Sequence, residues 1–331
     1  SLARSSGQKV AQTLNQYSAQ LTAIRKQTAD EMEISVKDAN TLLGKIATIN
    51  ESIKVATLQG TETNALNDMR NQYLDKLSSY MNIRATYLTD GTVSIASGST
   101  ALLDAAGGTV ATLETEDGAS GMRLLADGAP MNLAGGSLFG SMQVLNGKGS
   151  YAASGENSFR GIPYYQASLD SLADSLSSTF NALNGSALFT GSGAADIAIS
   201  SQWLANPNHI TATLDADGAK GKNDNILRMI SAMDEDRAIT SDFTGSFGGY
   251  VLALMGDVAI DKDYTADVSE TSDMVFRSIG NERESTMGVS LNEETANLIK
   301  YQKAFAASAR VMTALDETLD TVINRMGTVG R

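Results

Sequence analysis

Few residues of this chain are of types that catalyse reactions, and their spacing matches none of the common sites. His209 is the only histidine and cysteine is absent, so neither a catalytic triad nor a zinc site of the usual composition can be assembled. Asp215, Asp217 and Gly218 resemble the start of an EF-hand loop, but its twelfth position is Ile226 instead of a glutamate. We therefore predict a protein that is not an enzyme, with no catalytic residue, cofactor or metal centre.

Two weaker chemical readings stay open. Calcium accepts irregular oxygen cages, so a weak cation site near Asp215 or near Asp261 is one alternative. A carboxylate pair of the glycosidase type is the other, because the chain has 38 acidic residues. A phosphate-binding loop is excluded, since six residues separate Gly140 from Gly147 where four are required.

Composition and charge narrow the class of function further. The formal net charge is −13, and the 25 basic residues form no cluster, so a nucleic-acid partner is not expected. No run of 18 apolar residues occurs, so we expect no membrane partner and no membrane span. The start of the chain does not read as a secretory signal peptide. A length of 331 residues allows a substantial core and two domains.

The residues after Ser290 have the most regular pattern in the chain, with an apolar residue at every seventh position. Ser290 and Glu293 form a capping box, and Gly327 marks the end of the predicted helix. From Ser290 to Met326 this helix would be about 55 Å long. Because a lone helix with one apolar stripe is only marginally stable in water, it needs a partner. The stripe consists of Leu291, Leu298, Phe305, Met312, Leu319 and Met326, with a second row at Tyr301, Leu315 and Val322.

Helical periodicity also dominates the first 82 residues, which hold only three glycines. The first helix is predicted up to Gly60, with a stripe that slips by one position after Thr28. A second helix follows over residues 66–80. The stripe of the first helix consists of Val10, Leu14, Tyr17, Leu21, Ile24, Met32, Val36, Ala39, Leu43, Ile46 and Ile53.

Between Ile83 and Tyr151 the apolar period becomes two, and residues 85–157 hold thirteen glycines. This pattern predicts a small antiparallel β domain, with tight turns at Asp90-Gly91 and Asp127-Gly128. Strands are expected over residues 86–89, 92–95, 109–115, 122–125 and 131–133.

A helical pattern returns over residues 165–183, followed by a mixed segment at about 186–240 with a short helix near residues 226–233. Two further helices are expected, around residues 243–254 and 274–284. The predicted fold is therefore α+β: an elongated α-helical bundle built from both chain ends, with an inserted small antiparallel β domain. The predicted domains are residues 1–82 and 158–331, which form the helical domain with its long C-terminal helix, and residues 83–157, which form the β domain. We expect the first and last helices to pack side by side.

Several short segments resemble the bacterial flagellar axial proteins, and among them the hook-associated proteins. The phrase GVSLNEE at 288–294 resembles the start of their terminal helix, and NDMR at 67–70 with LDKL at 74–77 resembles their second helix. Similar segments are GGSL at 135–138, IPY at 162–164, LDSLA at 169–173, FN at 180–181 and LFTG at 188–191. Each piece is short, but their order along the chain is specific.

The resemblance implies a structural subunit at the hook–filament junction of the flagellum. It implies an extracellular location, with export by the flagellar type III system and no cleaved signal peptide. The implied partners are copies of itself in a ring, the hook protein, the neighbouring hook-associated protein and an export chaperone near the C-terminus. Such proteins have a further helical segment before the region of Ser1, so we expect this chain to be a fragment. Alternatives are another axial protein (the hook subunit or hook-associated protein 3) and a surface-displayed binding module.

The terminal stripe is the assembly surface that the resemblance implies. Its predicted partner-binding residues are Leu298, Tyr301, Phe305, Met312, Leu315, Leu319, Val322 and Met326. An aspartate at Leu298 or Phe305 is expected to disturb folding. The same change at Met312 or Leu319 is expected to spare folding and abolish assembly.

Overall fold

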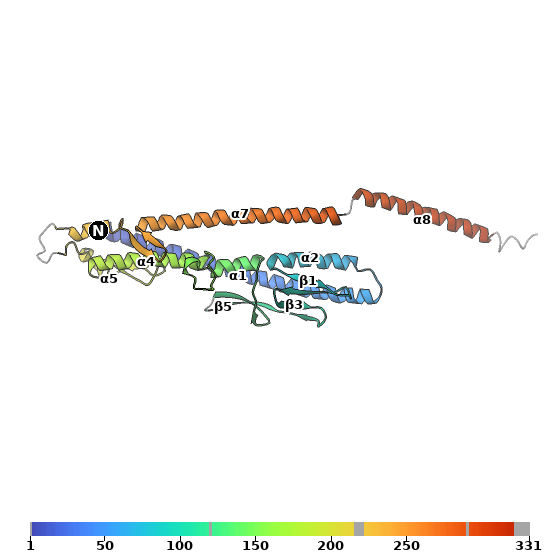
Figure 1. The fold of residues 1–331 in the computed structure, drawn as a ribbon, viewed down its shortest axis with the longest axis horizontal. Helices are drawn as coiled ribbons and strands as arrows, with labels where there is room; N and C mark the ends of the chain where they lie inside the picture. Colours follow the sequence, from blue (N-terminus) through green and yellow to red (C-terminus); the bar gives the residue numbers. More distant parts are fainter. Residues whose placement is uncertain (1, 119–120, 215–221, 289–290, 321–331) are drawn as a thin grey trace, which may run out of the picture. The chain divides into compact units, whose positions relative to one another are not determined.

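The computed structural model describes residues 2–118, 121–214, 222–288 and 291–320 (Figure 1). Its contacts divide the chain into two compact units, residues 1–258 and residues 259–331. The chain is α+β, because long helices alternate along it with small antiparallel sheets. The predicted fold class is therefore confirmed. The predicted pairing of the first and last helices, and the domain boundaries at residues 82 and 157, stay predictions.

The first unit is organised along α1 (Leu2–Leu58), which ends just before Gly60, where φ is +67°. The chain then turns into α2 (Asn64–Tyr80), which packs against the second half of α1. The second half of the α1 stripe is buried, since each of its side chains is at most 3 % exposed. These residues are Met32, Val36, Ala39, Leu43, Ile46 and Ile53.

Two antiparallel sheets follow, in the region where the apolar period is two. The first has the order β1-β2-β3-β4 and the second the order β5-β6-β7. Their strands are β1 (Arg84–Tyr87), β2 (Val93–Ser97), β3 (Thr100–Asp104), β4 (Thr109–Val110), β5 (Leu113–Gly118), β6 (Gly121–Ala126) and β7 (Ala129–Pro130). Both predicted turns are confirmed: Gly91 has φ +82°, and Asp127 and Gly128 have φ +50° and +77°. Positive φ at both central residues, the geometry that favours tight Asp-Gly hairpins, is found at Asp127-Gly128, whereas at Asp90-Gly91 only the glycine has positive φ.

The structure corrects the β prediction in three places. The expected strand at 109–115 is two strands of different sheets, because the chain changes sheet at Ala111. Residues 131–133 are not a strand, and α3 (Ser137–Asn146) lies inside the segment that was predicted to be β. This segment is helical because Leu138 and Leu145, seven residues apart, are both buried on one face of α3.

Two asparagines of α1 form hydrogen bonds with strands of the two sheets. The amide of Asn50 donates to the carbonyl of Val93 at 2.8 Å and accepts from its N–H at 3.1 Å. Asn40 makes the same pair of bonds with Leu113, both at 2.8 Å. Each side chain thus takes the place of a neighbouring strand for one residue of β2 or β5. Ten residues along the helix correspond to about 15 Å, which spaces the two sheets along α1.

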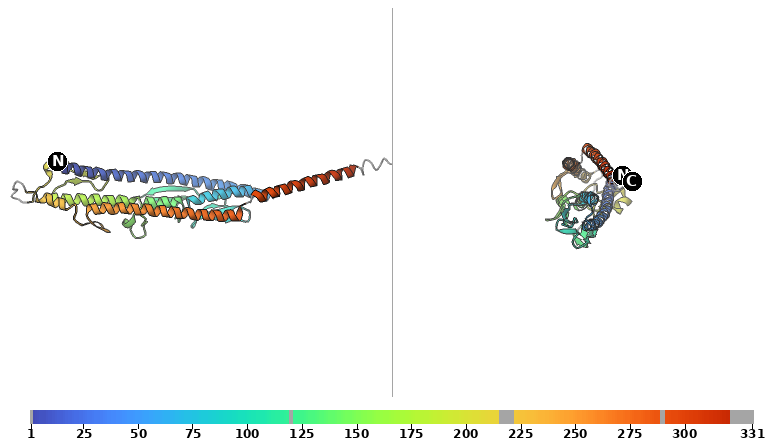
Figure 2. Two further views of the ribbon diagram at one scale, coloured as in Figure 1. Left: turned by 90° about the horizontal axis from the view of Figure 1, so that it is seen from above. Right: turned by 90° about the vertical axis from the view of Figure 1, so that its right-hand side faces the viewer.

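The buried apolar side chains form two cores along α1. The first core combines the second half of α1, α2 and α3 with the strands β2, β3, β5 and β6, so helices and sheets share one interior. The second core surrounds the first turns of α1 and contains the only tryptophan, Trp203. Figures 1 and 2 show α4 running along α1, and Leu169, Leu172 and Leu176 of α4 belong to the second core. The elements of this part are α4 (Ile162–Asn184), β8 (Phe189–Thr190), β9 (Ala198–Ile199), α5 (Ser201–Ala205), α6 (Asp224–Ser231), β10 (Arg237–Thr240) and β11 (Phe243–Gly245), with 3-10 turns at Gly149–Tyr151 and Pro207–His209.

The last part of the chain differs from the prediction of two short helices before the terminal one. A single helix, α7 (Phe247–Met287), covers both, and Phe243 belongs to β11. No proline lies between residues 247 and 287, so no residue there removes a helical hydrogen bond. The terminal helix is α8 (Leu291–Asp320), as predicted; its expected cap at Ser290 and its residues after 320 lie outside the described residues.

Candidate assembly surface

Helix α8 presents the apolar stripe of the sequence as an open surface. Leu298, Phe305 and Met312 follow each other at intervals of seven and are 57 %, 78 % and 67 % exposed. Tyr301 and Leu315, of the second row, are exposed as well. Large apolar side chains that gather on one exposed face mark an interaction surface in a soluble protein. Five of the eight predicted partner-binding residues are therefore exposed on α8.

The other three predicted residues are only partly covered by the structure. Leu319 lies within α8, but its side chain is outside the description, and Val322 and Met326 lie outside the described residues altogether. The different effects expected from an aspartate at Leu298 or Phe305 and at Met312 or Leu319 stay predictions.

Charge is segregated along α8. Glu293 and Glu294 lie in its first turn, where carboxylates interact favourably with the helix dipole. Residues 295–315 contain Lys300, Lys303 and Arg310 and no acidic residue, and all three cations are on exposed positions. With about 3.6 residues per turn, these cations lie on the face of α8 opposite the stripe, in a chain whose net charge is −13. This signal is visible in the sequence, but the periodicity analysis did not use it.

A second apolar row lies on the first turns of α1, within residues 1–258. Val10, Tyr17 and Ile24 are 42 %, 52 % and 50 % exposed, whereas Leu14 between them is buried. Members of the predicted stripe of the first helix therefore differ in exposure within residues 1–258. The three exposed residues differ from the buried positions because the second core touches α1 through Ala11 and Leu14, on a neighbouring face.

A polar cluster joins α4 to the start of α7. Arg160 contacts Asp257 at 2.5 Å between Nη1 and Oδ1, and the hydroxyl of Tyr164 donates to the other carboxylate oxygen at 2.8 Å. Burial and, after it, the bond to Asp257 raise the pKa of Tyr164 to about 12. Burial likewise raises the pKa of Tyr250, whose hydroxyl donates to the carbonyl of Ser168 at 3.2 Å. These phenols stay protonated at neutral pH, so the cluster acts as a set of hydrogen bonds rather than as acid–base machinery.

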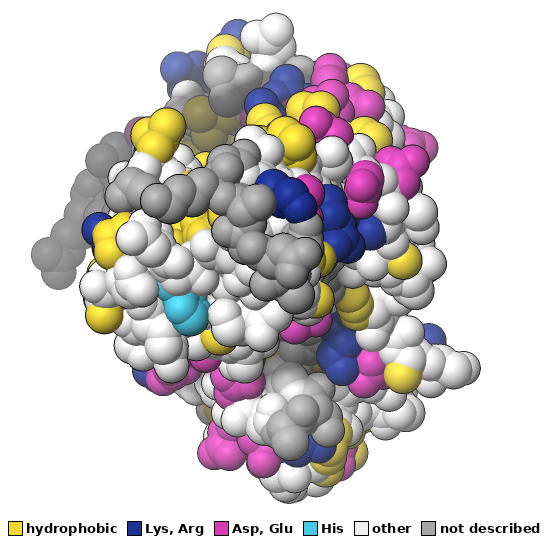
Figure 3. Space-filling model, turned by 90° about the vertical axis from the view of Figure 1, so that its left-hand side faces the viewer, with side chains coloured by type: hydrophobic (Ala, Val, Ile, Leu, Met, Phe, Trp, Pro, Cys, Tyr) yellow, Lys and Arg dark blue, Asp and Glu magenta, His cyan; other side chains and the backbone are white. Residues whose placement is uncertain are grey.

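The sole histidine does not form a catalytic pair. Nε2 of His209 lies 3.3 Å from the hydroxyl of Ser186 and 3.2 Å from the carbonyl of Ala187. A ring nitrogen that faces a carbonyl must carry the proton, so it is not available as a base toward the serine. Figure 3 shows this side chain on the surface of one end of the molecule. Its place in a 3-10 turn matches the turn-like sequence around it.

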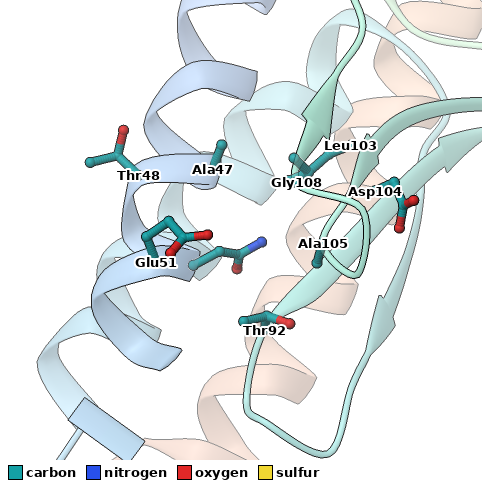
Figure 4. Close-up of a pocket in the computed structure, with 9 residues that line it drawn as sticks. Ala47, Thr48, Glu51, Thr92, Leu103, Asp104, Ala105 and Gly108 are labelled. Carbon is teal, nitrogen blue, oxygen red and sulfur yellow. The ribbon is translucent and has the colours of Figure 1, made fainter. Parts of the chain in front are cut away.

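A shallow cavity of about 220 Å³ lies between α1 and the first sheet (Figure 4). Glu51 of α1 and Asp104 at the end of β3 are among its lining residues, while Asn50 is hydrogen-bonded to the backbone of Val93 and Asp104 accepts from the N–H of Ala106. Across the parts of the chain that the structure describes, no three His, Cys, Asp or Glu residues come together as a metal site. Asp215 and Asp217, the other cation candidates, lie outside those parts. Of the helices in the described ranges, none combines the length and apolar character that a membrane crossing requires.

Comparison with known proteins places the chain in a family. A family model described as the flagellar hook-associated protein FlgK helical domain matches residues 1–199, and one described as the flagellar basal body rod FlgEFG protein C-terminal matches residues 283–326. Flagellar hook-associated protein 1 of Bacillus subtilis (strain 168) is 26 % identical over 363 residues, which cover 98 % of this chain and 71 % of the relative. The structure of the flagellar hook junction protein FlgK from Burkholderia pseudomallei shares 23 % identity and a TM-score of 0.48 over 57 % of this chain, and the match spans 36 % of that protein. Because the first family model covers more than half of the chain, this protein belongs to the FlgK family of flagellar hook-associated proteins.

Proposed function

We propose that this chain is a structural subunit of the bacterial flagellum at the hook–filament junction, without enzymatic activity. The observation that carries the proposal is the exposed apolar stripe of α8. Its described members, from Leu298 to Leu315, fall inside the segment that matches the C-terminal family model of the flagellar rod proteins. A surface of this kind is costly to leave in water, so its use is to be buried in an assembly.

The energy available from this stripe suits a permanent structural contact. Full burial of a large apolar side chain contributes about 1.5 to 3 kcal/mol. The five described side chains would together contribute on the order of 10 kcal/mol before the entropic cost of association. Lys300, Lys303 and Arg310, on the opposite face of α8, would favour further neighbours with an acidic surface, and copies of this acidic chain are such neighbours.

The partners that we assign follow from the same role. The subunit forms a ring with copies of itself, contacts the hook protein on one side and contacts the neighbouring hook-associated protein on the other. An export chaperone covers the apolar stripe near the C-terminus before assembly. Export by the flagellar type III system then delivers the protein outside the cell. Shielding of the stripe before assembly is a physical need, since exposed apolar helices associate without specificity.

The test compares Met312→Asp with Ala314→Asp in the source bacterium. Both variants add one carboxylate to α8, but Met312 lies on the stripe and Ala314 lies two positions away from it. We expect Met312→Asp to abolish filament attachment and swimming while the purified chain melts at the parental temperature. Ala314→Asp should swim. Normal motility of the Met312→Asp strain, with attached filaments, would refute the role of the stripe.

A further inference from the structure

The outer strands of the second sheet offer little to a further strand. Helix α1 packs against β5, and Asn40 bonds both backbone groups of Leu113 on its outer side. Arg25 of the same helix bonds both carboxylate oxygens of Asp117, at the other end of β5. On the opposite side of the sheet, β7 has only two residues, and one of them is Pro130, which has no N–H to donate. Both sides of this sheet are therefore protected against strand pairing.

The first sheet has an open edge along β1. The N–H of Leu88 donates to the carbonyl of Thr92 at 2.9 Å, which makes these residues a hydrogen-bonded pair of the hairpin. Because such pairs alternate along an antiparallel ladder, the backbone groups of Ala85 and Tyr87 point away from β2. Across the residues that the structure describes, these outward N–H and C=O groups have no hydrogen-bond partner. A row of unpaired backbone groups is a template for another strand.

The side chains of β1 leave this edge accessible and hold the strand in place. Arg84, Thr86 and Tyr87 are exposed, while Ala85 is partly buried against the first core. The guanidinium of Arg70, in α2, lies 5.1 Å from the ring centroid of Tyr87. Because side chains alternate along a strand, Arg84 and Thr86 share the outer face of the sheet. The edge is therefore presented by a strand whose inner face is anchored and whose outer face is polar.

We propose that the outer edge of β1 pairs with β1 of a second copy of this chain, antiparallel and centred on Thr86. In this register Ala85 lies opposite Tyr87 of the second copy, and every outward N–H and C=O of the strand gains a partner. Thr86 faces its own counterpart, which is a favourable cross-strand pair. The two Arg84 side chains are about 14 Å apart along the strands, so like charges do not oppose each other. The edge is thus complementary to itself, as a twofold contact requires, and the inference does not rest on the proposed function.

Disulfide trapping of the full chain tests this register. Because the chain has no cysteine, Thr86→Cys and Thr89→Cys each introduce a single thiol, both at exposed positions. In the proposed pair, the two residues at position 86 face each other within the reach of a disulfide, whereas those at position 89 are about 20 Å apart. Under mild oxidation we expect Thr86→Cys to form a covalent dimer at least about ten-fold faster than Thr89→Cys. Association through the exposed stripe of α8 gives no reason for this preference.

A further variant removes one of the pairing groups. Ala85→Pro, combined with Thr86→Cys, deletes the outward N–H of residue 85 and none of the hydrogen bonds between β1 and β2. We expect its covalent dimer to form as slowly as that of Thr89→Cys, while thermal melting verifies that the variant is folded. The comparison of the two single cysteine variants stands without it. Equal rates for Thr86→Cys and Thr89→Cys, or an unchanged rate in folded Ala85→Pro with Thr86→Cys, would overturn the self-pairing of β1.

Discussion

Replacing Asn50 with aspartate should destabilise the chain by more than one lost hydrogen bond would. Asn50 is 3 % exposed, and its amide satisfies both backbone groups of Val93. Asn50→Asp keeps the shape of the side chain and the acceptor for the N–H of Val93. It replaces the donor with a carboxylate oxygen that faces the carbonyl of Val93 at the former hydrogen-bond distance of 2.8 Å.

The magnitude follows from three costs. The lost bond contributes about 1 kcal/mol, and the carbonyl of Val93 is left buried without a donor at a cost of about 1 to 3 kcal/mol. The desolvated carboxylate adds a further penalty, so the free energy of unfolding should fall by about 3 to 5 kcal/mol at pH 7. This loss is a large part of the stability of an ordinary domain.

The loss should depend on pH in a defined direction. Burial raises the pKa of a carboxyl above its unfolded value of about 4. Because the pKa of the introduced carboxyl is higher in the folded than in the unfolded chain, the variant is most stable below the unfolded pKa. It loses stability as the pH rises through the folded pKa. The gap between Asn50→Asp and the parent should therefore narrow as the pH falls from 7 toward 4.

Urea unfolding followed by far-ultraviolet circular dichroism at several pH values measures this gap. The control is Asn297→Asp, the same change at an exposed position of α8, and it should leave the free energy of unfolding nearly unaltered. The reasoning fails if Asn50→Asp costs less than about 1 kcal/mol, which is the value of a single ordinary hydrogen bond. It also fails if the gap to the parent is independent of pH.

Three further changes test other parts of the fold by urea unfolding. Gly136→Ala should lower the free energy of unfolding by at least about 2 kcal/mol, because φ is +88° and the new Cβ would lie 2.4 Å from the backbone oxygen of Tyr80 at the end of α2. The control Gly140→Ala, at a position with open space, should leave the free energy of unfolding unchanged or raise it. Arg70→Lys should lower the free energy of unfolding by about 1 to 3 kcal/mol, because lysine cannot donate to the carbonyl of Gly91 and to Oδ1 of Asn67 at the same time. A decrease below about 0.5 kcal/mol would contradict this role of Arg70. The bond from Arg25 lowers the pKa of Asp117, so the contribution of this pair is present above pH 4 and is lost as the pH falls through the lowered pKa. Asp117→Asn should therefore weaken the acid dependence of unfolding while changing stability at pH 7 only slightly, and an unaltered acid dependence would contradict it.

The local features of this chain could be read from its sequence. Helix periodicity located α1, α2, α4 and α8, since a repeat of 3.6 residues and the stops around it are written in neighbouring residues. The hairpin turns at Asp90-Gly91 and Asp127-Gly128 were predictable for the same reason, because positive φ is a property of the turn residues themselves. The comparison with catalytic and metal-binding motifs also used only the spacing of residues close together in the sequence.

Some errors came from reading short patterns without their neighbours. Residues 109–115 look like one strand, yet the chain changes partners at Ala111, whose N–H bonds Leu102. The segment of α3 was taken as β because glycines surround it, although Leu138 and Leu145 carry a helical spacing. No role was predicted for Asn50 from the sequence. Its place between Ile46 and Ile53, on the buried side, was the signal that a polar group there must have a partner.

By itself, the sequence determined where the helices and turns lie and which positions belong to apolar stripes, because these depend on residues within a few positions of each other. Only the tertiary structure decided how those stripes are used. It separated the buried Leu14 from the exposed Tyr17 on one helix. It also brought Asn50 to Val93, 43 residues away, and Arg160 to Asp257, 97 residues away. No local period encodes such distances, since the partner of a polar group is chosen by the packing of whole elements rather than by its neighbours along the chain.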